Sequence, residues 1–200
     1  MKTLSRLKDV RVLGIDPSSH SLAWGVCKIT LQGDIEFESA GKIPLVKQEG
    51  VSASISSIVG VLPGVIKATN PDYFFIEQPV YIQNFQTSRI LSYIVGASIA
   101  MARAVRVPVV EASPLVWKTG IGYSKVTKKD IVAWTIQMGE KDAKKKASYE
   151  RKNRVRDLMI KRYSDEFSDH EKYDSDVIDA IGIATWGCQQ RLDVVCCTIL

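Results

Sequence analysis

The chain has few of the residues that bind soft metal ions. Its 200 residues include two His and four Cys, and none of these has the C-x-x-C or H-x-x-x-H spacing that is typical of zinc sites. Four scattered cysteines do not form the framework of a disulfide-rich secreted domain, and they fit a reducing compartment. Any metal site in this chain must therefore be built from oxygen ligands.

The sequence does not predict a membrane span or a signal peptide. The apolar run Ile90–Ala102 has 13 residues between two arginines, whereas a span needs about 20. The first ten residues include Lys2, Arg6 and Lys8 but no apolar stretch of the kind that signal peptides have. We therefore expect a soluble, intracellular protein that does not bind membranes, with Ile90–Ala102 as a core helix.

Positive charge is concentrated in one part of the chain. Residues 118–162 hold 14 Lys and Arg against five Asp and Glu, while the other 155 residues hold 13 basic and 17 acidic side chains. Such segregation is typical of a surface that binds a polyanion, because each neutralised phosphate releases counterions. A solvated helix face would have the same composition, so this feature alone leaves both interpretations open.

The order of the expected elements favours an α/β fold. Three strand-like segments come first, and a tight turn at Gln32–Asp34 joins the second to the third. Later segments alternate between strand and helix patterns, which favours a mixed sheet flanked by helices. Pro63 and Gly64 predict a break or kink in the first helix. The expected strands are Val10–Ile15, Leu22–Leu31, Ile35–Ile43, Tyr73–Ile76 and Val107–Val110, and the expected helices are Val51–Thr69, Thr87–Ala104, Lys129–Met138, Lys141–Tyr163 and Asp176–Gln190.

Four carboxylates lie at the ends of apolar segments or beside them. Asp16 follows the first strand and Glu77 follows the fourth. Asp176 and Asp179 are one turn apart in the last helix, so they share a face of it. Each has an ordinary alternative: Asp16 could only form a turn and Glu77 could be a solvated edge residue. Asp176 could cap its helix, although Asp174 competes for that role. Because open α/β sheets bind ligands at the carboxyl ends of strands, the ordered set predicts one acidic site.

Carboxylates that converge in this way repel one another unless a cation is bound. Hard oxygen ligands suit Mg²⁺ or Mn²⁺. Two such ions about 3.5–4 Å apart activate an attacking water and stabilise the leaving oxygen of a phosphodiester. The acidic residues therefore predict a site for two Mg²⁺ ions, with Mn²⁺ able to replace them.

The acidic segments resemble the motifs of a known family. Gly14–Ser19 (GIDPSS), Phe75–Pro79 (FIEQP) and Asp176–Ile181 (DVIDAI) are similar in order and spacing to the three acidic motifs of the RuvC-type Holliday junction resolvases. These enzymes are members of the ribonuclease H-like superfamily. The resemblance covers roughly residues 10–190, and the ordered set is far more specific than any one motif.

This resemblance implies a ribonuclease H-like α/β fold: a five-stranded mixed sheet, its first three strands antiparallel, with helices on both faces. It implies a homodimer that cuts two opposed strands of a four-way DNA junction and leaves 5′-phosphate and 3′-hydroxyl ends. Catalysis would be metal-assisted hydrolysis without a covalent intermediate. Asp16 would bridge both metal ions, Glu77 would hold one, and Asp176 and Asp179 would complete the site. The protein would act in the cytoplasm or in another compartment that contains DNA.

The basic residues match the family in part. Lys118 and Lys129 are similar to two lysines that the family places near the scissile phosphate, where lysine would stabilise the developing charge. Lys128 is an equally good candidate for the second position, and a generic DNA-facing lysine is the alternative for each. The predicted DNA-binding residues are Lys118, Lys125, Lys128, Lys129, Lys144, Lys145, Lys146, Arg151, Arg154 and Tyr81.

Two aromatic residues have open interpretations. Tyr81 is the candidate for a side chain that wedges the crossover open, and an ordinary packed aromatic is the alternative. Trp134 fits the apolar face of its helix, so we expect it in the core. Ile90–Met101 is the candidate dimer helix, although core packing alone would also explain it.

One nuclease domain is predicted at residues 1–192, with a basic helical insert at about 137–173 and a tail at 193–200. The insert is longer and more basic than in compact bacterial members of the family. It would strengthen phosphate contacts without reading bases, which could extend cleavage to other branched DNA. Ser18 stands where the family often has Gly, a change that would alter the turn beside Asp16.

Two other functions stay open at this point. An architectural protein that binds branched DNA with little or no nuclease activity would use the same basic surface, although it would not need the four carboxylates. The nucleotide-handling branch of the superfamily also has Asp at the end of its first strand. The chain lacks the G-x-x-x-x-G-K-[ST] phosphate loop, which speaks against nucleotide binding of that kind.

Overall fold

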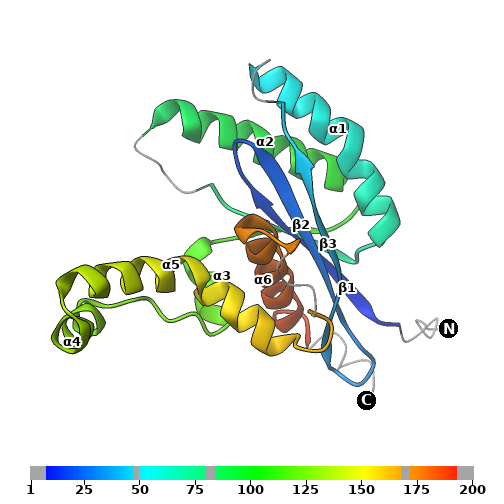
Figure 1. The fold of residues 1–200 in the computed structure, drawn as a ribbon. Coiled ribbons are helices and arrows are strands. Elements are labelled where there is room, and N and C mark those ends of the chain that lie inside the picture. The colour runs from blue at the N-terminus through cyan, green and yellow to red at the C-terminus, as the bar shows by residue number, and fades with distance from the viewer. Residues whose placement is uncertain (1–7, 47–49, 80–83, 168–171, 193–200) are drawn as a thin grey trace.

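The computed structural model describes residues 8–46, 50–79, 84–167 and 172–192. Its centre is a five-stranded sheet with the strand order β3-β2-β1-β4-β5 (Figure 1). The first three strands pair antiparallel, while β4 runs parallel to β1 and β5 runs parallel to β4, which confirms the predicted mixed sheet. The strands are β1 (Val10–Pro17), β2 (Ser21–Ile29), β3 (Ile35–Pro44), β4 (Tyr73–Glu77) and β5 (Val109–Ala112).

Helices cover both faces of the sheet (Figure 1). The two helices α1 and α2 pack on one face, while α6, α3 and the second half of α5 pack on the other. Figure 1 shows α4 and the first half of α5 projecting away from this body. We call residues 128–152 the arm. The helices are α1 (Gly50–Thr69), α2 (Phe85–Ala104), α3 (Pro114–Gly120), α4 (Lys128–Met138), α5 (Glu140–Arg162) and α6 (Ser175–Gln189).

Alternate residues of β1 belong to two separate hydrophobic cores. Leu13 and Ile15 are buried with the α1 and α2 side chains, whereas Val12 is buried with those of α6. Because side chains alternate along a strand, Asp16 is in phase with Val12. On β4, Phe75 belongs to the α6 core, so Glu77 is in phase with it. Both carboxylates therefore lie on the α6 side of the sheet.

Two glycines let α6 approach this face closely. A Cβ at Gly14 would collide with the backbone of Ala180 and Ala184, and a Cβ at Gly25 would lie 2.8 Å from the backbone nitrogen of Ile181. Any other residue at these positions would push the helix away from the strands. This close contact fixes the distance between α6 and the sheet. It thereby fixes where the carboxylates of α6 lie relative to the ends of the strands.

Helix α1 differs from the prediction in two ways. It is continuous through Pro63, so the predicted break is wrong; packing along a 20-residue helix outweighs the loss of one backbone hydrogen bond. Among the described helices, α1 rather than the Ile90–Ala102 segment is long and apolar enough to cross a membrane by length and composition. Its residues Ile58, Leu62 and Ile66 are buried against the sheet, as in a core helix.

Three further differences come from tertiary packing and turns. Trp134 lies in neither core, so the expectation that it is buried in the core is wrong: α4 has no buried residues, and Trp134 packs under Lys146, whose Nζ is 4.9 Å from the ring centroid. Strand β5 begins two residues later than predicted, after a turn in which Arg106 has φ 62°. Helix α3 has only seven residues and was not predicted.

Candidate active site

Asp16 and Glu77 lie at the carboxyl ends of two neighbouring parallel strands. In the β1–β4 ladder Ile15 pairs with Ile76, so the next residue of each strand lies at the same edge of the sheet. Both carboxylates are half-buried. Burial, followed by the negative charges of Glu77, Asp179 and Asp176, raises the pKa of Asp16 well above its ordinary value of 3.8. Several carboxylates are therefore concentrated at this edge, where burial makes even one ionised carboxylate unfavourable.

Helix α6 contributes the other two carboxylates. Asp174 caps the helix by accepting a hydrogen bond from the Val177 backbone at 3.1 Å, so Asp176 is free of the capping role. Burial raises the pKa of Asp179, and the positive charge of Lys118 opposes this shift. The structure thus brings Glu77, Asp176 and Asp179 within electrostatic reach of Asp16.

Lys118 lies among these carboxylates. Its Nζ is 3.0 Å from Oδ2 of Asp179, and its charge also acts on Glu77 and Asp16. Burial alone would lower the pKa of Lys118, but the charge of Asp179 and the hydrogen bond to it raise that pKa above its usual value. The ammonium therefore stays protonated and compensates part of the negative charge.

Asp176 is held by partners from β2 and β3, the two strands that lie on the other side of β1 from β4. It accepts hydrogen bonds from Lys42 Nζ on β3 at 2.8 Å and from Ser21 Oγ on β2 at 3.4 Å. Lys42 also bonds to Asp174 at 2.5 Å. Ser18, the departure from the family pattern, closes the turn before β2 by bonding to Ser21. This turn places the Ser21 hydroxyl within hydrogen-bond distance of Asp176.

The chemistry of these donors fits a hard divalent cation. Burial raises the pKa values of Asp16, Glu77 and Asp179 above their ordinary range, and a bound cation would reverse that effect. Within the described ranges, no three His, Cys, Asp or Glu side chains are already arranged to hold a metal ion. Binding would therefore require some of these side chains to move closer together and Asp179 to leave Lys118.

A cavity of about 620 Å³ opens beside the acidic site, between α5 and α6. Lys118 and Asp179 line one part of it, and Arg151 and Arg156 line another. Sequence analysis proposed Arg151 for DNA binding but missed Arg156, whose guanidinium also donates to the Tyr173 carbonyl at 2.7 Å. A cavity with arginines next to clustered carboxylates is suited to a phosphate backbone that approaches a cation site.

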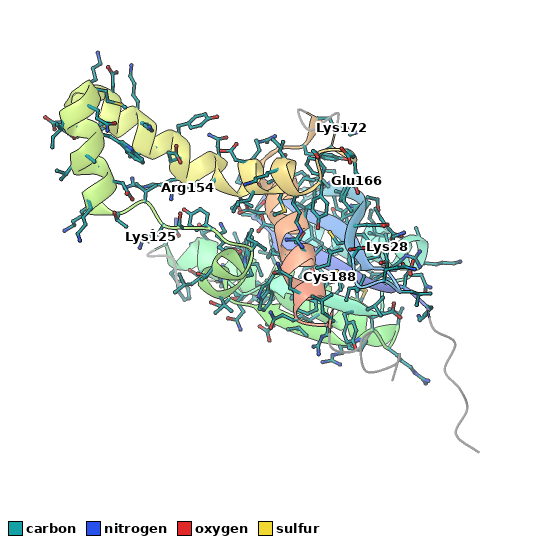
Figure 2. All side chains as sticks on the ribbon, turned by 90° about the horizontal axis from the view of Figure 1, so that it is seen from below. Lys28, Lys125, Arg154, Glu166, Lys172 and Cys188 are labelled. Carbon is teal, nitrogen blue, oxygen red and sulfur yellow. The ribbon has the colours of Figure 1, made fainter. Side chains whose placement is uncertain are left out.

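The other predicted DNA-binding residues lie along the arm and its base, as the side chains in Figure 2 illustrate for Lys125 and Arg154. Lys128 and Lys129 are exposed at the start of α4. Within the described ranges, no contact joins Lys129 to the carboxylates or to Lys118. Several basic side chains already have partners: Lys144 pairs with Glu140, Lys145 with Asp142, and Arg154 with Glu150 and Ser124. Tyr81 lies outside the described residues.

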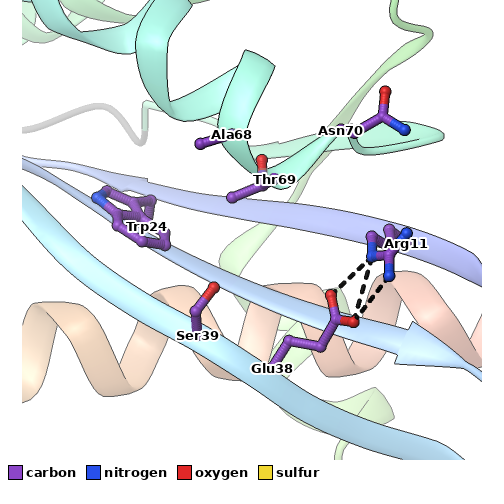
Figure 3. A pocket seen from close by; sticks show the side chains of 7 residues that line it. All are labelled: Arg11, Trp24, Glu38, Ser39, Ala68, Thr69 and Asn70. Atoms are coloured by element: carbon purple, nitrogen blue, oxygen red, sulfur yellow. Dashed lines mark hydrogen bonds and ion pairs between the residues drawn. The ribbon is translucent and has the colours of Figure 1, made fainter.

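The opposite face of the sheet has a different hollow. Figure 3 shows this pocket, where Arg11 and Glu38 form a bidentate ion pair below Thr69 and Asn70 of α1 and its following turn. Arg11 and Glu38 neutralise each other, and Trp24 supplies an apolar wall. This pocket is separated from the acidic site by the sheet and contributes nothing to it.

Sequence analysis missed Lys42 and Trp117 as members of the site. Lys42 lies on an edge strand far from every acidic motif, so only the fold brings it to Asp176. Trp117 was not singled out, yet its indole Nε1 donates to Glu77 Oε2 at 2.6 Å. Its position directly before Lys118 was the one available signal.

Comparisons with known proteins agree with this geometry. The family model described as crossover junction endodeoxyribonuclease RuvC matches residues 12–147, which includes the first two acidic motifs and ends before α6. RuvC of Salinibacter ruber is 31% identical over 121 residues, covering 60% of this chain and 67% of that protein. RuvC of Magnetococcus marinus is 28% identical over 129 residues, covering 64% and 71% respectively.

Solved structures extend the likeness to almost the whole chain. Thermus thermophilus RuvC in complex with a Holliday junction substrate has a TM-score of 0.64 at 17% identity, covering 92% of this chain and 96% of that one. The yeast mitochondrial Holliday junction resolvase Ydc2 has a TM-score of 0.57 at 15% identity, covering 98% and 89%. The fold, including α6, is therefore that of the ribonuclease H-like resolvases. Together with the family match, this shows that the chain belongs to the RuvC family of crossover junction endodeoxyribonucleases.

Proposed function

We propose that the protein is a metal-dependent endonuclease that resolves four-way Holliday junctions. The observation that carries this proposal is the meeting of Asp16, Glu77 and Asp179 at one edge of the sheet in a RuvC-family chain. The basic cavity beside them supports a phosphodiester substrate. A nuclease of this kind acts inside the cell, where its DNA substrate is found.

The four carboxylates would hold two Mg²⁺ ions, or Mn²⁺ in their place. When bound, these ions would supply Lewis-acid stabilisation of the scissile phosphate and an activated water. Hydrolysis of the bond between phosphorus and the 3′ oxygen would add the hydroxyl of water to phosphorus and its proton to the 3′ oxygen, which would leave 5′-phosphate and 3′-hydroxyl ends. Lys118, once released from Asp179, would bind a phosphate oxygen and stabilise the charge that grows in the transition state.

The remaining basic residues contact the DNA backbone in this proposal. Arg151 and Arg156 would bind phosphates in the cavity beside the site. Lys128 and Lys129, at the exposed start of α4, would bind phosphates farther along the duplex. Such contacts carry no sequence information, so the arm would strengthen binding to several kinds of branched DNA.

Paired cutting of two opposed strands requires two active sites, which we propose a homodimer supplies. Helix α2 buries Ile94, Val95 and Ser98 in its own core but exposes Tyr93 and Gly96 on the opposite face. That face is available to a second copy of the chain. Sedimentation of the protein at working concentration tests this: a dimer supports paired nicking, and a monomer contradicts it.

Cleavage of a synthetic four-way junction with Mg²⁺ tests the proposed activity. The protein should produce symmetric nicks in two opposed strands. Asp16→Asn and Glu77→Gln should each lose several kcal/mol of transition-state stabilisation, about a thousandfold in rate or more, while still binding the junction. The matched control is Asp34→Asn, which makes the same chemical change in the exposed β2–β3 turn.

Two results would overturn the proposal. An active Asp16→Asn variant would rule out the assigned mechanism. Equal binding with and without metal, combined with no cleavage of any branched substrate, would favour an architectural protein, a role for which the basic arm also provides a surface.

A further inference from the structure

A hydrogen bond from an uncharged donor connects α3 to the acidic site. The indole Nε1 of Trp117 lies 2.6 Å from Oε2 of Glu77. Trp117 has no solvent-exposed surface, whereas Glu77 is half-buried. Hydrogen bonds to an ionised carboxylate are shorter and stronger than those between neutral groups. This one ties a carboxylate on β4 to a helix that lies about 40 residues later in the chain.

Packing holds the indole ring in place. A Cβ at Gly182 would lie 2.7 Å from Cζ3 of Trp117, so the absence of a side chain at Gly182 makes room for the ring. Gly182 is on α6, three residues after Asp179. The ring therefore lies between the helix that carries Asp179 and the strand that carries Glu77. Because the ring cannot shift without displacing α6, the direction of its N–H is set by the fold.

The next residue of α3 holds the neighbouring carboxylate in a different way. Lys118 pairs with Asp179 at 3.0 Å, and its ammonium lies 5.0 Å from the centre of the Trp117 ring. An ammonium cancels the charge of the carboxylate that it binds. An indole N–H only donates a hydrogen bond and carries no net charge, so Glu77 keeps its negative charge.

The two oxygens of Glu77 are consequently distinct. Oε2 accepts the indole hydrogen bond, while Oε1 accepts none from the part of the chain that the structure describes. A carboxylate held by one oxygen has lost most of its rotational freedom before any ligand arrives. Its second oxygen can then bind a cation without a further loss of side-chain entropy.

We propose that Trp117 is a positioning residue of the acidic site: its indole N–H fixes Glu77 in the orientation that binds a divalent cation and leaves the negative charge of Glu77 in place. This inference rests on the proposed function and adds a residue that acts through Glu77. Loss of a hydrogen-bonding partner behind a metal ligand typically costs 10–100-fold in metal affinity or activity.

The metal dependence of cleavage by Trp117→Phe tests this inference. Phenylalanine keeps an aromatic ring beside Gly182 but cannot donate the hydrogen bond to Glu77. The Mg²⁺ concentration for half-maximal cleavage should rise about tenfold. Saturating Mg²⁺ should restore the rate to within about threefold of the original protein, and KM for the junction should not change.

Trp186→Phe is the matched control. Trp186 is also nearly buried in the α6 core, but its ring packs edge-on against Phe75 and no described bond joins it to a carboxylate. This control loses a similar amount of packing and should keep the original Mg²⁺ dependence. Equal Mg²⁺ dependence of Trp117→Phe and Trp186→Phe would overturn the inference.

A second measurement needs no cleavage and no metal. The chain has four Trp residues, so its ¹⁵N-labelled protein gives four indole N–H resonances, which Trp→Phe variants assign. In the metal-free protein, Glu77→Gln should move the resonance of Trp117 and leave those of Trp24 and Trp134 in place. A Trp117 resonance that does not respond would contradict the inference. If the original protein cuts no junction, the proposed function is wrong. The resonance measurement still shows whether Trp117 is hydrogen-bonded to Glu77.

Discussion

Of the fifteen residues of α6, eleven are buried, whereas α4 has no buried residue. Helix α6 is held against the sheet at Gly14 and Gly25, and it carries two of the four carboxylates. Helix α4 packs on α5 and presents Lys128 and Lys129 to solvent. Cation ligands need fixed positions, whereas lysines that bind a phosphate backbone need reach and charge. We therefore propose that the body carries out catalysis and that the arm adds affinity for DNA.

The tight packing of the body predicts the largest effect on stability. Gly14→Ala should cost about 3 kcal/mol or more, because the added Cβ meets the backbone of Ala180 and Ala184 and neither can move alone. Gly60→Ala is the control: this exposed α1 glycine has open space around its Cβ position, so the change should be neutral or stabilise by about 0.5–1 kcal/mol. Urea unfolding measures both, and a tolerated Gly14→Ala would show that α6 is not fixed at this point.

The arm should affect binding and not the rate of chemistry. Replacing Lys144, Lys145 and Lys146 by Ala should weaken junction binding about a hundredfold at moderate salt. It should also reduce the slope of log K against log salt by about 2.7, since three phosphate contacts are lost. The single-turnover rate at saturating protein should stay unchanged. Filter binding and cleavage measured in parallel check this, with Lys67→Ala on the exposed side of α1 as control.

A triple variant that binds normally would show that the arm does not touch the DNA. A triple variant that binds normally but cuts slowly would place the arm in catalysis and remove the distinction between the two regions.

The acidic site should destabilise the metal-free body. The pKa of Asp16 is raised above 3.8 in the folded protein, so the native state binds this proton more tightly than the unfolded chain does. Stability therefore falls as pH rises from about 3.8 through the raised pKa. Asp16→Asn removes this penalty and should increase the melting temperature in EDTA by about 2–6 °C at pH 8, with a smaller gain at pH 5. A lower melting temperature at pH 8 would contradict the assigned electrostatics.

The smallest effect is expected where α5 joins the body. The hydroxyl of Tyr163 is 2.8 Å from Oγ1 of Thr185 and 3.6 Å from Sγ of Cys27. Tyr163→Phe removes these contacts, but Thr185 keeps its bond to the Ile181 carbonyl, so the cost should be about 1 kcal/mol. Thermal unfolding measures it. Junction affinity should not change, and a large loss of affinity would mean that this anchor orients the arm.

Sequence patterns predicted the body better than the details of the site. Strand alternation and the spacing of Asp16, Glu77 and the α6 carboxylates are local or periodic features, so they are visible in one dimension. The partners Lys42 and Trp117 come from an edge strand and a short helix, and only the folded sheet brings them to the carboxylates. The burial of Trp134 was predicted wrongly for a related reason. The apolar face of a helix does not show whether the helix packs on the body or, as α4 does, on one other helix. The domain boundaries and the roles of the individual site residues stay predictions.

A crystal soaked in Mn²⁺ tests most directly whether the four carboxylates form a cation site. The account predicts anomalous density at the sheet edge, in contact with Asp16, Glu77 and at least one carboxylate of α6, with Lys118 moved away from Asp179. Soaked crystals with no Mn²⁺ at this edge, or with Mn²⁺ bound only elsewhere, would contradict it.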